Sequence, residues 1–484
     1  PTDEAILSGR LVDRAVRPLF PSTLRNEIAV VATVFSHDQE NDADIPALIG
    51  ASCALALSDI PWAGPIASVR VGRVNGAHVL MPTYQQTEQG DLDLVVAGTA
   101  EKTIMVEAGA KQIPEAEMLA ALRFASESLR PVIELIQQVV AKHGKTKLVK
   151  PPAELDTAKA EGLQRVKQVV ETFFAEHGHE LFAEPLRTKA DRKRALKAFA
   201  ERVIAYATEQ GIGKDWKNTL WQRIEDAAEA AVTHMILDKQ HRPDGRGIHE
   251  IRPLGAMVAV LPRTHGSGLF QRGSTQVLSA VTLGSPGMEQ TLDTMEFQMT
   301  KRYFHHYNFP SYAVSETKPN RGPGRREIGH GALAERAIMP VLPQRDAFPY
   351  TMRVVSEVLE SNGSSSMGAT CGSTLALMDA GVPISAPVAG IAMGLASDES
   401  TNRYQVITDL QDMEDGAGGM DFKIAGSKDG ITAMQMDTKT TGLPWSVVEE
   451  TLARARDARL NVLNAMLEVI PAPRAELSKY APRI

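Results

Sequence analysis

The sequence has only two cysteines, Cys53 and Cys371, and its aromatic side chains make up 5% of 484 residues. Two cysteines cannot staple a chain of this length, so we expect a cytoplasmic protein in a reducing compartment, without a disulfide. Few aromatics argue against a broad stacking platform of the kind that single-strand binders use. No apolar run is long enough to cross a membrane, which predicts no membrane partner.

Positive charge is not in excess either. The chain has 52 Lys and Arg against 59 Asp and Glu, for a net charge of −7. This balance argues against a protein that coats nucleic acid by bulk attraction. Any anionic substrate must therefore be held by local clusters of arginine and lysine.

The chain contains an internal repeat. Three stretches of its first part recur in the same order further along: 8–21 as 330–343, 50–53 as 368–371, and 90–99 as 418–427. Three matches in one order predict a duplication, so a difference between the copies marks a function that one copy has gained or lost. Far more residues precede the first match in the second copy, so we expect the first copy to be N-terminally incomplete. Each cysteine lies in one copy, where we expect it to be buried.

Strands and helices occur in blocks in both copies, which predicts an α+β fold. In the first copy the expected strands are 28–35, 69–72, 76–81 and 92–96, and the expected helices are 45–58 and 115–142. Residues 150–238 have helical spacing and little glycine, which predicts an all-α insert. The predicted domains are 1–147 for the first copy, 148–240 for an all-α domain, 241–472 for the second copy and 473–484 for a C-terminal tail.

A serine-rich turn is the first candidate site. Ser364, Ser365 and Ser366 precede a helix expected over 369–379. The free N–H groups of a helix start attract anions, and serine hydroxyls add donors. A plain serine N-cap is the alternative. The first copy has Asn41–Asp44 at this junction, and carboxylates there would cap a helix but repel phosphate, so the difference favours an anion site in the second copy.

A basic cluster is the second candidate. Arg326 and His330 are four residues apart, so they share one face of a helix start, and Arg325 lies beside them. Guanidinium groups bind phosphate oxygens in a bidentate manner. The alternative is a solvated basic turn with a capping histidine. In the first copy Ser8 replaces His330, and Pro1–Glu4 contains no arginine.

The third candidate combines two carboxylates and an ammonium group. Asp421 and Lys423 are two residues apart, so they point to the same side of a strand, and a glycine-rich turn brings Asp415 back toward them. Oxygen ligands of this kind suit Mg²⁺ or Mn²⁺ beside a phosphate. A hairpin with a surface salt bridge is the alternative. In the first copy Asp93 remains but Val95 replaces Lys423, which predicts a lone carboxylate without a basic partner.

Two common catalytic patterns are missing from this inventory. The sequence has no G-x-x-x-x-G-K-[ST] loop, which excludes a P-loop NTPase, and the clustered serines have no evident His–Asp partners. The second copy therefore suits phosphoryl transfer by positioning and charge neutralisation, with inorganic phosphate as a reactant.

Six motifs are spread along the chain. They are RPDGR at 242–246, LPRTHGS at 261–267, FHHYNFP at 304–310, RREIGHG at 325–331, ESNGSSS at 360–366 and MDFK at 420–423. Together they closely resemble the bacterial polynucleotide phosphorylase family. The resemblance implies two tandem RNase PH-like α+β domains joined by an all-α domain, with three chains in a ring. It also implies reversible, metal-dependent 3′-to-5′ phosphorolysis of single-stranded RNA to nucleoside diphosphates, in mRNA degradation.

The resemblance also implies roles for individual residues. They are Ser364, Ser365 and Ser366 for inorganic phosphate; Arg325, Arg326 and His330 for phosphate and the 3′ nucleotide; Asp415 and Asp421 for Mg²⁺ or Mn²⁺, with Lys423 beside them; and Arg263, His265, Arg325 and Arg326 for RNA. Partners implied by the family are an endoribonuclease and a helicase in an RNA-decay assembly.

The chain departs from the family pattern in three ways. A Phe-Phe-Arg-Arg loop and the KH and OB-fold modules do not occur in this sequence, and Gly419 stands where many relatives have an aspartate. The alternatives to a phosphorolytic enzyme are a ring-forming RNA scaffold without catalysis and a hydrolytic nuclease. The intact serines, His330 and carboxylates of the second copy favour the enzyme.

Overall fold

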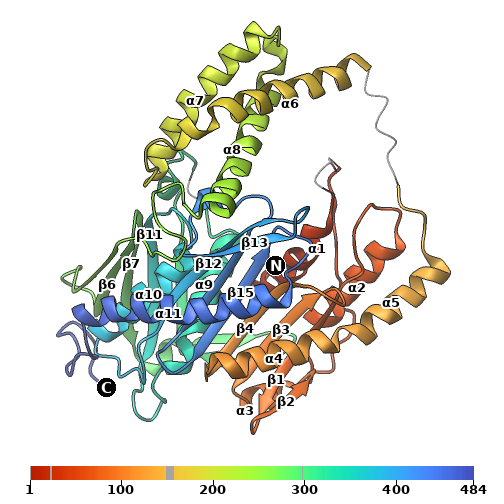
Figure 1. Ribbon diagram of the computed structural model, residues 1–484. Helices are drawn as coiled ribbons and strands as arrows, with labels where there is room; N and C mark the ends of the chain where they lie inside the picture. Colours follow the sequence, from red (N-terminus) through yellow and green to blue (C-terminus); the bar gives the residue numbers. More distant parts are fainter. Residues whose placement is uncertain (1, 22–23, 25, 149–156, 297, 320) are drawn as a thin grey trace.

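The computed structural model describes residues 2–21, 24, 26–148, 157–296, 298–319 and 321–484. Two β-sheets enclose one buried helix, further helices cover the outside, and a helical hairpin-like domain projects from one end (Figure 1). The mixture of helices with mainly antiparallel strands confirms the predicted α+β class.

The larger sheet has eight strands in the order β13-β12-β14-β15-β4-β3-β1-β2, and every neighbouring pair is antiparallel. Its centre is the pair β4–β15, and the two copies extend outward from it in the same strand order. Strands β3 and β14 cover the matched stretches 92–98 and 420–426, as duplication predicts. The strands are β1 (Ala67–Val74), β2 (Ala77–Leu80), β3 (Leu92–Gly98), β4 (Thr103–Ile113), β12 (Ala389–Asp398), β13 (Arg403–Thr408), β14 (Met420–Gly426) and β15 (Ile431–Thr438).

The smaller sheet belongs to the second copy. Its order is β10-β11-β7-β6-β5, with β10 parallel to β11 and the other neighbours antiparallel. A separate hairpin, β8 with β9, lies between β7 and β10 in the chain. These strands are β5 (Leu254–Val258), β6 (Gly266–Arg272), β7 (Thr275–Gly284), β8 (Gln290–Asp293), β9 (Gln298–Lys301), β10 (Tyr303–Asn308) and β11 (Thr351–Glu360).

Helix α10 (Ser365–Asp379) lies between the two sheets, and all of its 15 residues are buried. Glycines on the flanking strands allow this close approach. A Cβ on Gly268 of β6 would come within 2.6 Å of Leu375 Cβ, and one on Gly390 of β12 would come within 2.6 Å of Met367 Sδ. A helix buried all round needs small and apolar residues on every side, which the sequence of α10 supplies.

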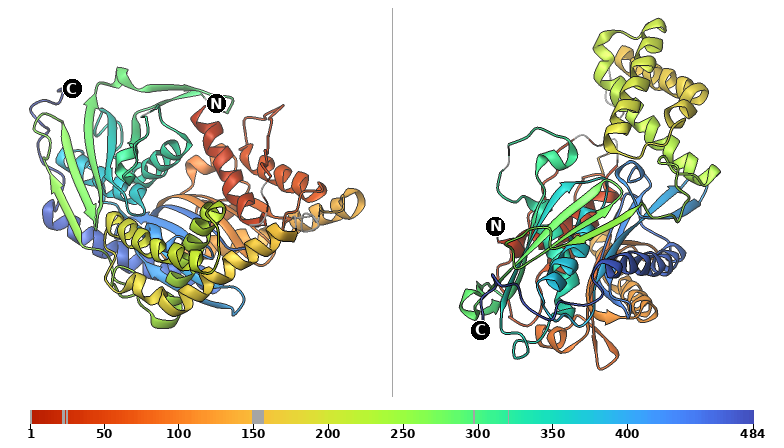
Figure 2. Two further views of the ribbon diagram at one scale, coloured as in Figure 1. Left: turned by 90° about the horizontal axis from the view of Figure 1, so that it is seen from above. Right: turned by 90° about the vertical axis from the view of Figure 1, so that its left-hand side faces the viewer.

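Other helices cover the large sheet. Helices α1 and α9 pack against each other, and α1 contacts β4 while α9 contacts β15. The two helices begin and end at corresponding residues of the two copies. Helices α4 and α11 also contact each other and lie across the outer face (Figures 1 and 2). The helices are α1 (Asp3–Val16), α2 (Asp44–Leu57), α3 (Tyr84–Gln89), α4 (Glu115–Ser128), α5 (Arg130–His143), α9 (Arg325–Ile338) and α11 (Trp445–Val469).

The described residues of the predicted insert are helical, as expected. Helices α6 (Thr157–His177), α7 (Lys189–Glu209) and α8 (Lys217–Lys239) share a core of their own, and α8 also packs on β12. Figure 1 shows them projecting from the body of the molecule. None of the helices in the described ranges is long and apolar enough to cross a membrane.

Several expectations for the first copy need correction. The helix expected over 115–142 is two helices, because Pro131 has no backbone N–H to continue α4 and instead lies in the first turn of α5. The sequence analysis missed β4 altogether. Cys53 is half-buried rather than buried, whereas Cys371 is buried, and both are free thiols.

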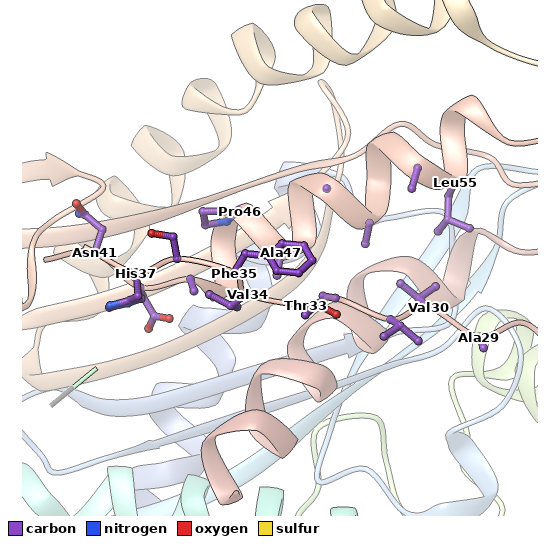
Figure 3. A pocket seen from close by; sticks show the side chains of 18 of the residues that line it. Ala29, Val30, Thr33, Val34, Phe35, His37, Asn41, Pro46, Ala47 and Leu55 are labelled. Atoms are coloured by element: carbon purple, nitrogen blue, oxygen red, sulfur yellow. The ribbon is translucent and has the colours of Figure 1, made fainter. Parts of the chain in front are cut away.

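The strand expected over 28–35 is also wrong. These residues form no regular element, and Val31 and Phe35 are 85% and 96% exposed. In the register of the repeat they correspond to β11, which lies hydrogen-bonded between β10 and β7. No described strand of the first copy offers such partners, so the segment runs beside α2 across a pocket of about 800 Å³ (Figure 3).

A buried ion pair ties the two copies together at the centre of the large sheet. Glu107 of β4 bonds Arg14 of α1 through one carboxylate oxygen and Arg336 of α9 through the other, at 2.6 Å for Arg336. The two arginines occupy the same position of the repeat. Burial raises the pKa of Glu107, but the two guanidinium groups outweigh burial and lower it to about 2.

We expect Glu107→Gln to destabilise the protein at neutral pH, because breaking a buried pair costs roughly 3–5 kcal/mol. The folded pKa of about 2 lies below the ordinary 4.5. The stabilisation is therefore complete above the unfolded pKa and disappears as pH falls toward the folded one. Thermal midpoints from scanning fluorimetry should differ widely between wild type and variant at neutral pH and converge near the folded pKa. A gap that is independent of pH would contradict the assignment.

Candidate active site

The serine-rich turn leads directly into α10. The helix begins at Ser365, four residues before the predicted start, so Ser365 and Ser366 lie in its first turn. Ser364 caps it in the left-handed conformation, at φ 51°. The buried hydroxyl oxygens of Ser364 and Ser366 have no hydrogen-bond partner in the described part of the chain. Two unpaired donors at the positive end of a helix form an anion-binding arrangement.

A buried charge network holds this turn in place. Arg252 donates to the Asn362 carbonyl at 2.6 Å, and Arg272 donates to the Ser364 carbonyl at 3.1 Å. Both arginines pair with Asp409, at 2.7 and 2.8 Å. Burial raises the pKa of Asp409, but the arginines outweigh burial and lower it far below its usual range. The sequence analysis missed all three charged residues, because no local pattern shows that they meet.

His330 lies next to the serines through a tyrosine. The Tyr307 hydroxyl is 2.7 Å from Ser365 Oγ and 3.3 Å from His330 Nδ1. Burial lowers the pKa of His330 well below its usual value, and the charges of Arg326 and Lys423 lower it further. The imidazole is therefore neutral at physiological pH. Tyr307 belongs to the FHHYNFP motif, but the sequence analysis gave it no role.

The two predicted arginines point in different directions. The Arg326 guanidinium lies over the Phe309 ring, 4.4 Å from its centroid, on the side of Tyr307 and His330. Arg325 instead faces helix α1, where a Cβ on Gly9 would come within 3.2 Å of its guanidinium. Of the two arginines, Arg326 is the one whose charge acts on His330 and Tyr307.

The first copy adds an arginine to this site. Arg10 of α1 lies against the start of α9, where a Cβ on Gly329 would come within 2.3 Å of Arg10 Nε. Burial, followed by the charge of Arg14, lowers the pKa of Arg10, and Arg10 itself contributes to the lowered pKa of His330. Comparison of the two copies could have drawn attention to Arg10, since the matching residue of the second copy is Ala332.

The residues of the third candidate cluster lie at β14 and the turn before it. Asp421 and Lys423 lie on the same side of β14, with Asp421 Oδ2 at 2.5 Å from Lys423 Nζ, and Asp421 Oδ1 is buried without a partner among the described residues. Burial and the charge of Asp421 raise the pKa of Asp415 to about 6. Asp415 also pairs with Lys439 at 3.1 Å.

These two carboxylates could hold a divalent cation only in part. Within the described ranges no group of three or more His, Cys, Asp or Glu is arranged as a metal site. Mg²⁺ commonly binds through one or two carboxylates and completes its shell with water and phosphate oxygens. The unpaired oxygen of Asp421 and the nearby Asp415 fit that mode of binding.

Arg263 and His265 lie away from the cluster. Arg263 stacks on Tyr480 at 4.7 Å, and His265 Nδ1 accepts from the Leu283 N–H at 2.8 Å. They precede β6, whereas Arg272 at its other end contacts the serine turn. A strand of this length spans about 20 Å. The structure therefore does not bring these two residues to the serines.

In the first copy, one arginine pairs with all three carboxylates at the counterpart of the site. Asp93 was expected to lack a basic partner, but Arg70 bonds it at 2.7 Å and also bonds Asp42 at 2.8 Å and Asp44 at 2.7 Å. Burial raises the pKa of Asp44 to about 7. Arg70 lies on β1 opposite Val95, so the cation comes from the neighbouring strand. Sequence comparison of β3 with β14 alone could not reveal it.

Comparisons with known proteins show which family the chain resembles. Family models for the 3′ exoribonuclease family match residues 1–61 and 250–383 (domain 1) and residues 64–128 (domain 2). The chain is 48% identical over 486 residues to the polyribonucleotide nucleotidyltransferase of Heliobacterium modesticaldum, covering 100% of this chain and 66% of that protein. It is 49% identical to the enzyme of the same name from Bacillus pumilus, covering 67% of it.

The chain thus spans about two thirds of the length of the curated relatives it matches. The match covers both copies and the helical domain. The chain therefore belongs to the 3′ exoribonuclease family and, within it, to the polyribonucleotide nucleotidyltransferases.

Proposed function

We propose that the protein degrades single-stranded RNA from the 3′ end by phosphorolysis and releases nucleoside diphosphates. The observation that carries this proposal is the pair of buried, unpartnered hydroxyls of Ser364 and Ser366 at the start of α10. An unpaired buried donor costs about 1–3 kcal/mol, which a bound anion would recover. The relatives named polyribonucleotide nucleotidyltransferase support the same activity.

Inorganic phosphate is the co-substrate in this proposal. It would accept from the serine hydroxyls and the free N–H groups of α10, with Arg326 as the adjacent cation. The neutral His330 and the ammonium of Lys423 would lie beside the scissile phosphodiester. Their donors would compensate the charge that develops as the bond is transferred. The reverse reaction, polymerisation of diphosphates, uses the same contacts.

Asp415 and Asp421 would hold Mg²⁺ or Mn²⁺. Lys423 would lie beside them, where it pairs with Asp421. The cation would neutralise charge on the phosphate oxygens during transfer. Because no group of three or more such ligands is arranged as a metal site in the described ranges, we propose that the cation shares its remaining ligand positions between water and substrate.

The wider setting follows the family. We propose a homotrimeric ring that binds single-stranded RNA in the cytoplasm, where free Cys53 and Cys371 stay reduced, and that joins an endoribonuclease and a helicase in RNA decay. Arg263, His265 and Arg325 would contact RNA away from the serines. We keep the domain boundaries at 1–147, 148–240 and 241–472, with the tail at 473–484.

The first test is phosphate dependence. We expect a short single-stranded RNA to be shortened only when inorganic phosphate and Mg²⁺ are both supplied, with nucleoside diphosphates as products on thin-layer chromatography. Nucleoside monophosphates, or equal degradation without phosphate, would identify a hydrolytic nuclease instead.

Replacement of Asp421 tests the metal. We expect Asp421→Asn to abolish turnover and to weaken Mn²⁺ binding, followed by electron paramagnetic resonance, at least about tenfold, because it removes a charged ligand. The matched control is Asp93→Asn, at the same position of the first copy, which should retain wild-type turnover. Full activity of Asp421→Asn would exclude this metal site.

Replacement of Ser366 tests the anion site. We expect Ser366→Ala to raise the KM for phosphate by about tenfold to a hundredfold, the cost of one hydrogen bond to a charged group, with little change in the KM for RNA. Ser373→Ala is the control, because Ser373 lies on the same helix but bonds the Ala369 carbonyl at 2.7 Å. A change confined to RNA binding would refute the assignment.

A further inference from the structure

Strand β10 presents a row of polar aromatic side chains to the helices above it. Tyr303, His305 and Tyr307 alternate along the strand and are 3%, 6% and 4% exposed. Residues two apart on a strand share one face, so all three point the same way. Only Tyr307, near the C-terminal end of β10, reaches residues of the candidate site.

The Tyr307 hydroxyl bridges two elements that carry site residues. It lies 2.7 Å from Ser365 Oγ at the start of α10 and 3.3 Å from His330 Nδ1 on α9. The Tyr307 and His330 rings also meet edge to face, with centroids 5.3 Å apart. One hydroxyl can donate once and accept twice, so it can bond both partners together.

The backbone keeps this contact short. A Cβ on Gly331, next to His330, would come within 3.3 Å of Tyr307 Cβ and 3.2 Å of the His305 carbonyl oxygen. Glycine therefore lets α9 approach β10 more closely than a larger residue would. This packing fixes the height of His330 above the Tyr307 hydroxyl.

Phe309 links Tyr307 to Arg326 by packing against both side chains. Its ring stacks on Tyr307 at 6.3 Å with an interplanar angle of 21°, and Arg326 lies 4.4 Å above it. The end of β10 thus underlies a serine, a histidine and an arginine of one site.

We propose that Tyr307 is a positioning residue, whose hydroxyl sets Ser365 and His330 relative to each other so that phosphate meets both. The proposal rests on the proposed phosphorolysis. Without the hydroxyl, the Ser365 side chain loses the only side-chain hydrogen-bond partner that it has among the described residues, and the His330 ring loses the bond that orients Nδ1. Burial raises the pKa of Tyr307, so the hydroxyl keeps its proton at physiological pH.

The test compares two tyrosines on one strand. Tyr307→Phe removes the bridging hydroxyl, whereas Tyr303→Phe removes a buried hydroxyl that has no hydrogen-bond partner among the described residues. We expect Tyr307→Phe to raise the KM for inorganic phosphate about fivefold to tenfold and to leave the KM for a short RNA within about twofold. Tyr303→Phe should match wild type in both.

A double variant separates positioning from packing. If Tyr307 acts through Ser365, Tyr307→Phe combined with Ser365→Ala should raise the phosphate KM no more than about twofold beyond Ser365→Ala alone. Fully multiplicative effects would overturn the proposal. So would an unchanged phosphate KM in Tyr307→Phe, or an equal rise in Tyr303→Phe, which would indicate a general effect on the sheet.

Wild-type kinetics distinguish the proposed role of Tyr307 from the proposed phosphorolysis on which it rests. Degradation by the wild-type chain that does not depend on phosphate would refute the proposed function itself. Phosphate-dependent degradation in wild type, with no effect of Tyr307→Phe, would refute only the role of Tyr307. Thermal midpoints show whether both variants are folded. We expect them within a few degrees of the wild-type value, which is about the change that the loss of one hydrogen bond predicts.

Discussion

The antiparallel pairing of β4 with β15 is the constraint on which the rest of the structure depends. It fuses the two copies into one sheet and places α1 of the first copy beside α9 of the second. Glu107 secures this arrangement, because its two carboxylate oxygens satisfy Arg14 and Arg336 from the two copies. A buried carboxylate with two cationic partners tolerates no slip of one copy against the other, since a shift would leave a charge unpaired.

This geometry explains why the site is composite. His330 stands on α9 between Gly329, which admits Arg10 of the first copy, and Gly331, which admits Tyr307 of β10. The first copy therefore does more than complete the sheet. Its charge reaches the site and helps to keep His330 neutral.

The copies have diverged in how they treat buried polar groups. In the first copy Arg70 pairs with Asp42, Asp44 and Asp93, so each of these carboxylates has a cationic partner. In the second copy the hydroxyls of Ser364 and Ser366 remain unpaired in the described structure. Each unsatisfied buried group in a folded protein calls for an explanation, and a bound anion would supply one for these two hydroxyls.

Comparison of the repeats made much of the site predictable. The serine turn, the facing of Arg326 with His330, and the facing of Asp421 with Lys423 follow from short spacings on a helix or strand, which local geometry fixes. The prediction of a strand over 28–35 was wrong because a strand needs neighbouring strands as hydrogen-bond partners, and the hydropathy of a segment does not show whether they are present. The same limit hid Asp409 and its arginines, which meet across more than 130 residues of chain.

The sequence by itself determined the duplication, the α+β class, the helical insert and the kinds of chemical group in the second copy, because these depend on periodicity and on residue type. Only the tertiary structure decided that Arg325 turns toward α1, that Arg70 pairs with three carboxylates of the first copy, and that Tyr307 joins α9 to α10. Those outcomes depend on the distance between side chains far apart in the chain, and that distance is set by the packing of the sheets around α10.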